Sequence, residues 1–78
     1  MPPLKPVHWK TLECVFKKAG FKLLRHQGTS HRIYHKPGIS RPIVIPTYSE
    51  IRVDIILNNL RTAGISRNEY FELLKKCK

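Results

Sequence analysis

Glycine positions divide this chain into short segments, and the apolar pattern between them changes from helical to alternating and back. Gly20 and Gly64 each follow a helical stripe, where a helix C-terminus favours a residue that can adopt positive φ. Gly28 and Gly38 interrupt runs with strand character. A chain of 78 residues supports one domain and buries only about 60% of its unfolded surface, so we expect no deep substrate cavity.

Three segments have helical periodicity and three have strand character. The stripes predict one helix at about residues 7–19, a second at about 52–63, and a short third one at the end of the chain. Ser66 and Glu69 have the spacing of a capping box at the start of the third helix. The predicted strands, bounded by Gly and Pro, cover residues 21–27, 31–35 and 42–46.

This order predicts an α+β fold, α-β-β-β-α with a three-stranded antiparallel sheet covered on one face and a short C-terminal helix. In the second strand, residues 31, 33 and 35 point to one face and residues 32 and 34 to the other. The sequence leaves open which face the helices cover. No internal repeat or linker divides the chain, so we expect a single domain over residues 1–78.

The charge balance is strongly basic. Lys and Arg number 15 against 5 Asp and Glu, which gives a formal net charge of +10. This excess indicates a polyanionic partner such as nucleic acid. The cluster Lys75-Lys76-Cys77-Lys78 is interpreted as a solvated end that adds nonspecific attraction.

Cysteine spacing and hydropathy argue against several other classes of protein. Cys14 and Cys77 lie far apart, with no second Cys or His at ligand spacing, so we expect neither a disulfide framework nor a zinc site. No run approaches the roughly 18 apolar residues of a membrane span, and the first residues lack the apolar stretch of a signal peptide. We therefore expect a cytoplasmic protein with no membrane partner and no cofactor.

Four stretches in their order along the chain resemble the HicA (YcfA-like) toxin family. They are Gly20-Phe21, Gly28-Thr29-Ser30-His31-Arg32-Ile33-Tyr34, Val44-Ile45-Pro46 and Leu60-Arg61-Thr62-Ala63-Gly64-Ile65-Ser66. The resemblance implies a double-stranded-RNA-binding-domain-like fold. It also implies an mRNA interferase, a ribonuclease toxin held inactive by a HicB-like antitoxin. The histidine of a Gly-Ser-His-type motif is catalytic in that family, and it corresponds to His31. One position departs, because Tyr48 stands where many relatives have a second histidine.

The chemistry of RNA cleavage without a metal is compatible with one histidine. It needs a base for the 2′-hydroxyl, an acid for the leaving oxygen and positive charge around the phosphate. Histidine can act as base or acid near neutral pH, so we predict that His31 is a general acid/base. We predict RNA contacts on or near the same hairpin, with Arg32 and Lys36 ranked first: Gly28, Thr29, Ser30, Arg32, Lys36, Arg25 and Arg41.

Other polar and aromatic residues have simpler interpretations. The remaining histidines lack partners at ligand spacing and are interpreted as solvated, so we predict no metal site: His8, His26 and His35. Ser30 is not expected to be a nucleophile, because adjacent strand residues point to opposite faces and no acidic residue is placed to orient the imidazole. Tyr34 and Tyr48 are interpreted as core or rim residues in preference to base-stacking ones.

A non-catalytic double-stranded-RNA-binding module is the alternative, and it explains the fold and the charge equally well. Such modules usually rely on lysines in a loop and at a helix N-terminus. Here Glu50 and Asp54 lie near the start of the second helix and repel phosphate. This favours the ribonuclease, with RNA and a HicB-like antitoxin as partners. A degenerate member retained only as a partner-binding subunit is a third possibility.

Overall fold

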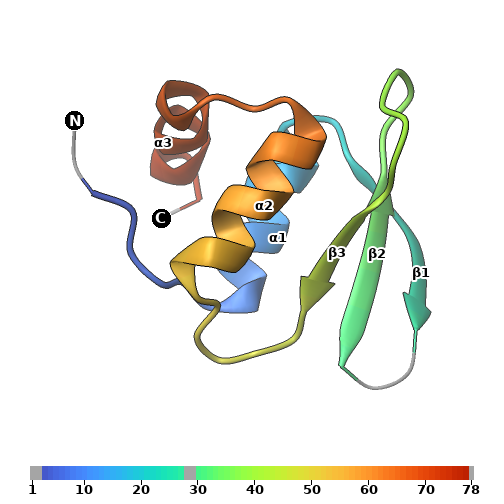
Figure 1. Ribbon diagram of the computed structural model, residues 1–78, viewed down its shortest axis with the longest axis horizontal. Helices are drawn as coiled ribbons and strands as arrows, with labels where there is room; N and C mark the ends of the chain where they lie inside the picture. The colour runs from blue at the N-terminus through green and yellow to red at the C-terminus, as the bar shows by residue number, and fades with distance from the viewer. Residues whose placement is uncertain (1–2, 28–29, 78) are drawn as a thin grey trace.

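The computed structural model describes residues 3–27 and 30–77, which form a sheet with helices on one of its sides (Figure 1). The elements in chain order are α1 (Trp9–Lys18), β1 (Lys22–Gln27), β2 (His31–His35), β3 (Ile43–Pro46), α2 (Val53–Ala63) and α3 (Arg67–Lys75). The predicted α+β class and order are confirmed, and β2 has the predicted bounds. Within the described residues, no helix is long and apolar enough to cross a membrane.

The sheet is an antiparallel meander with strand order β1-β2-β3. Ile33 of β2 is paired with Arg25 of β1 and with Val44 of β3. A β-bulge places Leu24 as an extra residue on β1, between Leu23 and Arg25. Because directly paired residues point to the same face, Arg25, Ile33 and Val44 share one face of the sheet.

The structure answers the question of which face the helices cover. Tyr34 is paired with Ile43, and both belong to the hydrophobic core between the sheet and the helices. Residues 31, 33 and 35 therefore point away from the helices, to what we call the open face of the sheet. Ile33 is only 5% exposed although it lies on the open face and outside the core cluster.

Local sequence accounts for where the helices begin and end. The ring nitrogen Nδ1 of His8 accepts a hydrogen bond from the Lys10 N–H at 3.1 Å, so His8 caps α1. The predicted cap of α3 is confirmed, because Ser66 Oγ accepts from the Glu69 N–H at 3.1 Å. Helix α2 ends at Gly64, whose φ of 71° is the left-handed conformation that favours glycine.

The core joins the predicted apolar stripes of the helices to the inner face of the sheet. Its fully buried members are Leu12, Val15, Phe16, Tyr34, Ile43, Ile45, Ile51, Ile56 and Tyr70. The segment before α1 is joined to the β3–α2 loop by an isolated bridge between Val7 and Ile51. The start of α1 and the loop after β3 are therefore held side by side.

The expectation of no disulfide is wrong, because Cys14 and Cys77 form one. Their Cα atoms are 6.0 Å apart although 63 residues separate them along the chain. Helix α3 packs against α1, and this contact brings the end of α3 to the middle of α1. Sequence spacing carries no sign of such a tertiary contact. The bond fastens α3 to α1 and is a single link, not a framework of several bridges.

We expect the double substitution Cys14→Ser/Cys77→Ser to lower the free energy of unfolding. A cross-link over so long a loop restricts the unfolded chain, by about 4 kcal/mol in the chain-entropy treatment. Thermal unfolding with and without dithiothreitol measures the effect. Reductant should lower the melting temperature of the parent and leave that of the double variant unchanged. A parent insensitive to reductant would contradict the prediction.

Candidate functional site

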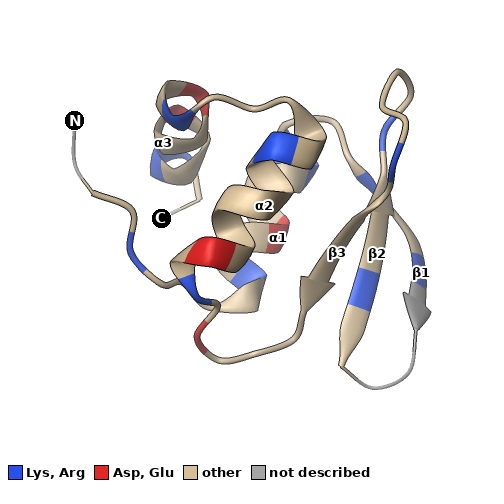
Figure 2. Ribbon diagram, viewed as in Figure 1, with Lys and Arg blue, Asp and Glu red and all other residues tan. Residues whose placement is uncertain are grey.

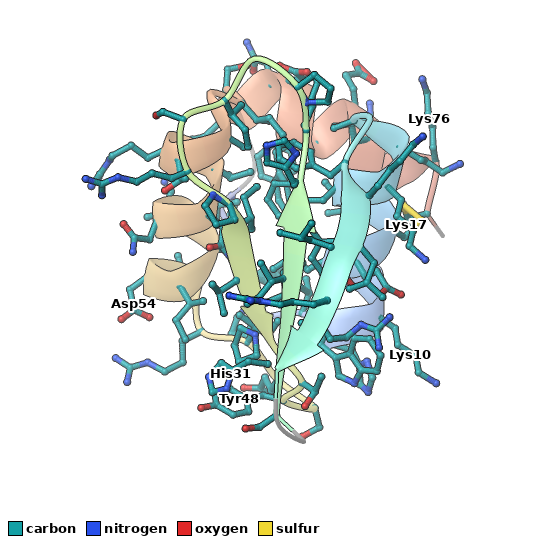
Figure 3. The ribbon with its side chains drawn as sticks, turned by 90° about the vertical axis from the view of Figure 1, so that its right-hand side faces the viewer. Lys10, Lys17, His31, Tyr48, Asp54 and Lys76 are labelled. Carbon is teal, nitrogen blue, oxygen red and sulfur yellow. A yellow bond between two sulfur atoms is a disulfide. The ribbon has the colours of Figure 1, made fainter. Side chains whose placement is uncertain are left out.

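His31 is the first residue of β2 and is exposed on the open face of the sheet. Its neighbours in the ladder are Gln27 on β1 and Pro46 on β3. The view onto the open face shows His31 at the end of the sheet, next to the chain segment that follows β3 (Figure 3). His31 is exposed because it lies at the end of the strand and on the open face.

Ser30 lies directly beside the imidazole of His31. Its Oγ is 3.2 Å from His31 Nδ1, which contradicts the expectation that adjacent residues point apart. The reason is that Ser30 lies in the turn before β2, where strand alternation does not apply. The Ser30 carbonyl accepts a hydrogen bond from the Thr47 N–H at 2.8 Å, which fixes the turn against the segment after β3.

The Ser30 contact determines which nitrogen of His31 is available to a ligand. When Nδ1–H donates to Ser30 Oγ, Nε2 has a lone pair and can take a proton. When the serine hydroxyl donates to Nδ1, Nε2 carries a proton and can give it away. In both states Nδ1 is occupied and Nε2 is left for chemistry.

Arg32, predicted as a leading phosphate contact, lies on the helix side of β2. Its Nε donates to a Glu13 carboxylate oxygen on α1 and to the Tyr34 hydroxyl, each at 3.0 Å. The Tyr34 hydroxyl in turn donates to the same carboxylate oxygen. The guanidinium also lies over the Trp9 ring, 5.2 Å from its centroid. A phosphate would have to compete with Glu13 for this cation.

Burial and hydrogen bonding perturb the titration of this cluster. Removal from water, and then the hydrogen bond to Glu13, raise the pKa of Tyr34 to about 12. The hydrogen bond to Tyr34 raises the pKa of Arg32, with the carboxylate of Glu13 adding to the effect. No local sequence pattern indicates this cluster, because Glu13 is 19 residues from Arg32 along the chain.

The other predicted RNA contacts lie at different places along the sheet. Arg25 is exposed on the open face and is paired with Ile33, the middle residue of β2, two positions along the strand from His31. Lys36 follows β2 at the opposite end, about 16 Å from His31 at the usual strand rise. Its ammonium lies over the Phe21 ring. Arg41 lies in the loop before β3, also at that far end. Gly28 and Thr29 fall outside the described residues.

No acidic residue lies on any strand of the sheet. The five Asp and Glu residues are on the helices and in the β3–α2 loop, whereas the strands carry lysine and arginine (Figure 2). The exposed cations that the register places on the open face are Lys22 and Arg25, and this face therefore favours an anionic ligand.

Two further histidines can be placed. His8 is exposed, as expected, but its side chain also caps the N-terminus of α1. His35 is exposed at the far end of β2. The side chain of His26 is outside the described part of the chain. Among residues 3–27 and 30–77, no three His, Cys, Asp or Glu side chains gather in a way that could hold a metal ion.

Tyr48 follows the segment that is hydrogen-bonded to Ser30, the residue before His31, and this tertiary contact could not be read from the sequence. Tyr48 is 48% exposed, and its carbonyl accepts a hydrogen bond from the Trp9 N–H at 3.2 Å. Figure 3 shows Tyr48 and His31 at the same end of the sheet. Tyr34, by contrast, is fully buried and is a core residue, as expected.

These features define a small α+β domain with an exposed histidine at the end of a basic sheet. A family model described as HicA toxin of bacterial toxin-antitoxin matches residues 9–65, from the start of α1 to just beyond α2. The chain belongs to this family and is a toxin of a toxin–antitoxin system. The matched segment contains the whole sheet and His31 but ends before α3. No curated protein matches the chain significantly.

We expect Tyr34→Phe to destabilise the protein by about 1–2 kcal/mol at neutral pH, because the lost hydroxyl bridges Arg32 and Glu13. The contribution of Tyr34 is complete below pH 10 and is lost as pH rises toward its folded pKa of about 12. The difference in unfolding free energy between parent and variant should therefore shrink over that interval. Denaturant titrations at several pH values measure it. A constant difference would contradict the assignment of the raised pKa to Tyr34.

Proposed function

We propose that this toxin is a metal-independent endoribonuclease that cleaves mRNA, with His31 as its general acid/base. The observation that carries the proposal is the exposed imidazole of His31, held by Ser30 at the end of a sheet without carboxylates. Membership of the HicA family and the net charge of +10 support an RNA substrate. Because mRNA is the substrate, we expect the toxin to act in the cytoplasm.

The cleavage uses the 2′-hydroxyl of the substrate as the nucleophile. His31 Nε2 either takes the proton of this hydroxyl, while water protonates the departing 5′-oxygen, or gives a proton to the 5′-oxygen, while water takes the proton of the hydroxyl. The 2′-oxygen bonds to the adjacent phosphorus as the bond from phosphorus to the 5′-oxygen breaks. A 2′,3′-cyclic phosphate and a free 5′-hydroxyl result. One acid–base group accelerates such a step by about 10²–10⁴-fold, so the proposal implies a slow enzyme.

Positive charge on the open face supports binding of the scissile phosphate. Among the predicted RNA contacts, Arg25 is exposed on this face and is paired with Ile33, two positions along β2 from His31. Ser30 places its hydroxyl and its backbone N–H near the imidazole, where they can contact the phosphate. Gly28 and Thr29 remain predicted RNA contacts. Lys36 and Arg41 lie far from His31 and are better suited to hold RNA that extends along the sheet.

A HicB-like antitoxin is the proposed inhibitor. The basic open face favours a partner that is acidic or that inserts polar groups beside His31, because opposite charges attract and position the two surfaces. Such a partner would exclude RNA from the same face.

The non-catalytic RNA-binding module is less well supported by the start of α2. Asp54 lies in the first turn of α2, exposed, with its carboxylate 3.4 Å from Arg52 Nε. A carboxylate at a helix N-terminus competes with phosphate for the backbone N–H groups and partly neutralises the adjacent arginine.

We expect His31→Ala to abolish RNA cleavage in the presence of EDTA while RNA binding is retained, because the imidazole supplies proton transfer and little of the net charge. His35→Ala is the matched control, since His35 lies on the same strand and face but at the far end. The measurement is cleavage of a long single-stranded RNA, with filter binding of the same RNA. Cleavage should persist in the His35 variant.

The contrary outcomes are distinct. Binding without cleavage by the parent would support the RNA-binding module. Equal cleavage by the parent and the His31 variant would remove His31 from the mechanism. Cleavage that EDTA abolishes would overturn the metal-independent mechanism.

We expect Arg25→Gln to weaken RNA binding and to reduce the salt dependence of binding by about one released counterion, as loss of one phosphate contact does. Arg67→Gln removes the same charge from the exposed start of α3 and is the control. Binding titrations over a series of salt concentrations give both slopes. Identical slopes for the two variants would show that Arg25 contributes only to the general charge.

A further inference from the structure

We propose that Tyr48 binds an unpaired RNA base by stacking, next to the phosphate at His31, so that the toxin selects single-stranded RNA at its cleavage position. This inference rests on the proposed ribonuclease function and adds a specificity-determining residue to it.

The first observation is the exposure of the Tyr48 ring. The large apolar side chains exposed among the described residues are Leu23, Leu24, Val44 and Tyr48, and Tyr48 is the aromatic one. The other tyrosines, Tyr34 and Tyr70, are almost completely buried. Tyr48 belongs neither to the core cluster nor to the partly buried residues that pack against it. Within the described residues, its ring therefore does not contribute to the core.

The second observation is the anchoring of its backbone. The Trp9 N–H donates to the Tyr48 carbonyl at 3.2 Å, which holds the segment to the start of α1. The preceding residue, Thr47, donates its N–H to the Ser30 carbonyl at 2.8 Å. Tyr48 is thus fixed on one side to α1 and on the other to the turn that orients His31. An exposed ring on a fixed backbone loses little freedom when it binds a ligand.

The third observation is the position of the two residues at the same end of the sheet. His31 and Tyr48 lie together at one end of the sheet when its open face is viewed (Figure 3). His31 is proposed to act at the sugar and phosphate, and the base of the same or the adjacent nucleotide lies within reach of a neighbouring aromatic ring. One nucleotide step can therefore contact both residues.

Stacking of a base on Tyr48 favours single-stranded RNA over a duplex. Every base has a flat π-face, and stacking on an aromatic residue tolerates any sequence, with an effect of about 10-fold or more on affinity per base. In a duplex these faces are covered by neighbouring base pairs, and proteins contact the sugars and phosphates instead. A tyrosine beside the cleavage position therefore favours an unpaired nucleotide.

The test measures RNA binding in the His31→Ala background, where the proposed cleavage is absent. Three double variants are compared with it: His31→Ala/Tyr48→Phe, His31→Ala/Tyr48→Ala and His31→Ala/Leu24→Ala. The phenylalanine variant keeps the aromatic face. The Leu24 variant is the control for loss of an exposed apolar side chain, because Leu24 is 60% exposed on β1. The probes are one fluorescent single-stranded RNA and the same RNA annealed to its complement.

Loss of Tyr48 should weaken single-stranded binding by about 10-fold or more and leave duplex binding unchanged. The phenylalanine and Leu24 variants should bind as their parent does. Equal weakening on both probes, or no weakening on either, would overturn the inference. So would loss of affinity in the phenylalanine variant, because stacking needs the ring and not the hydroxyl.

Failure of the proposed function would look different. If the unmodified toxin cleaves no RNA but Tyr48→Ala still weakens single-stranded binding selectively, the ribonuclease proposal fails and the stacking residue stands. If no variant binds either probe, both proposals fail. If cleavage is normal and Tyr48→Ala changes nothing, only the stacking inference fails.

Discussion

The ion pair between Arg32 and Glu13 connects the strand that carries His31 to the first helix. Both side chains are largely buried, and Tyr34 adds its hydroxyl to the same carboxylate. In such surroundings an ion pair is screened less than one on the surface, and removal of one partner leaves the other charge without compensation. Because β2 is the central strand, fixing it to α1 also fixes β1 and β3. His31 is adjacent to Arg32 along the chain and is positioned by the same contact.

Because of strand alternation, β2 has residues that contact the helices on one face and exposed histidines on the other. Arg32 and Tyr34 face the helices and hold the layers together, while His31 and His35 face outward. A register slip of one residue would exchange the two sets, placing the imidazoles in the core and the guanidinium in water. The buried network therefore sets the register that leaves His31 exposed. The predicted drop in stability of Tyr34→Phe at neutral pH measures part of this constraint.

Local patterns predicted the elements well, because periodicity, glycine ends and the Ser66 cap act over a few residues. The contacts that build the site act over longer separations and leave no local pattern. Glu13 meets Arg32 and Cys14 meets Cys77 only after the chain has folded. Alternation alone was also misleading at Ser30, which belongs to a turn and not to the strand. The predicted phosphate role of Arg32 rests on its charge alone, because a sequence does not show that Glu13 lies beside it in the fold.

The cations of the sheet differ in their distance from His31, so they would contribute differently to RNA binding and to RNA cleavage. At physiological ionic strength charges more than about 8 Å apart are largely screened, and Lys36 lies about 16 Å from His31 along the strand. In the proposed function, Lys36 and Arg41 would therefore attract and hold the RNA but would contribute little to stabilising the charge that develops at the scissile phosphate. That stabilisation is assigned in the proposal to Arg25, two positions along the ladder from His31, while Ser30 contacts the imidazole ring. A high net charge with few groups beside the imidazole fits a toxin that binds RNA readily and cleaves it slowly. In this proposal, an inhibitor that covers only the His31 end of the sheet would already block cleavage.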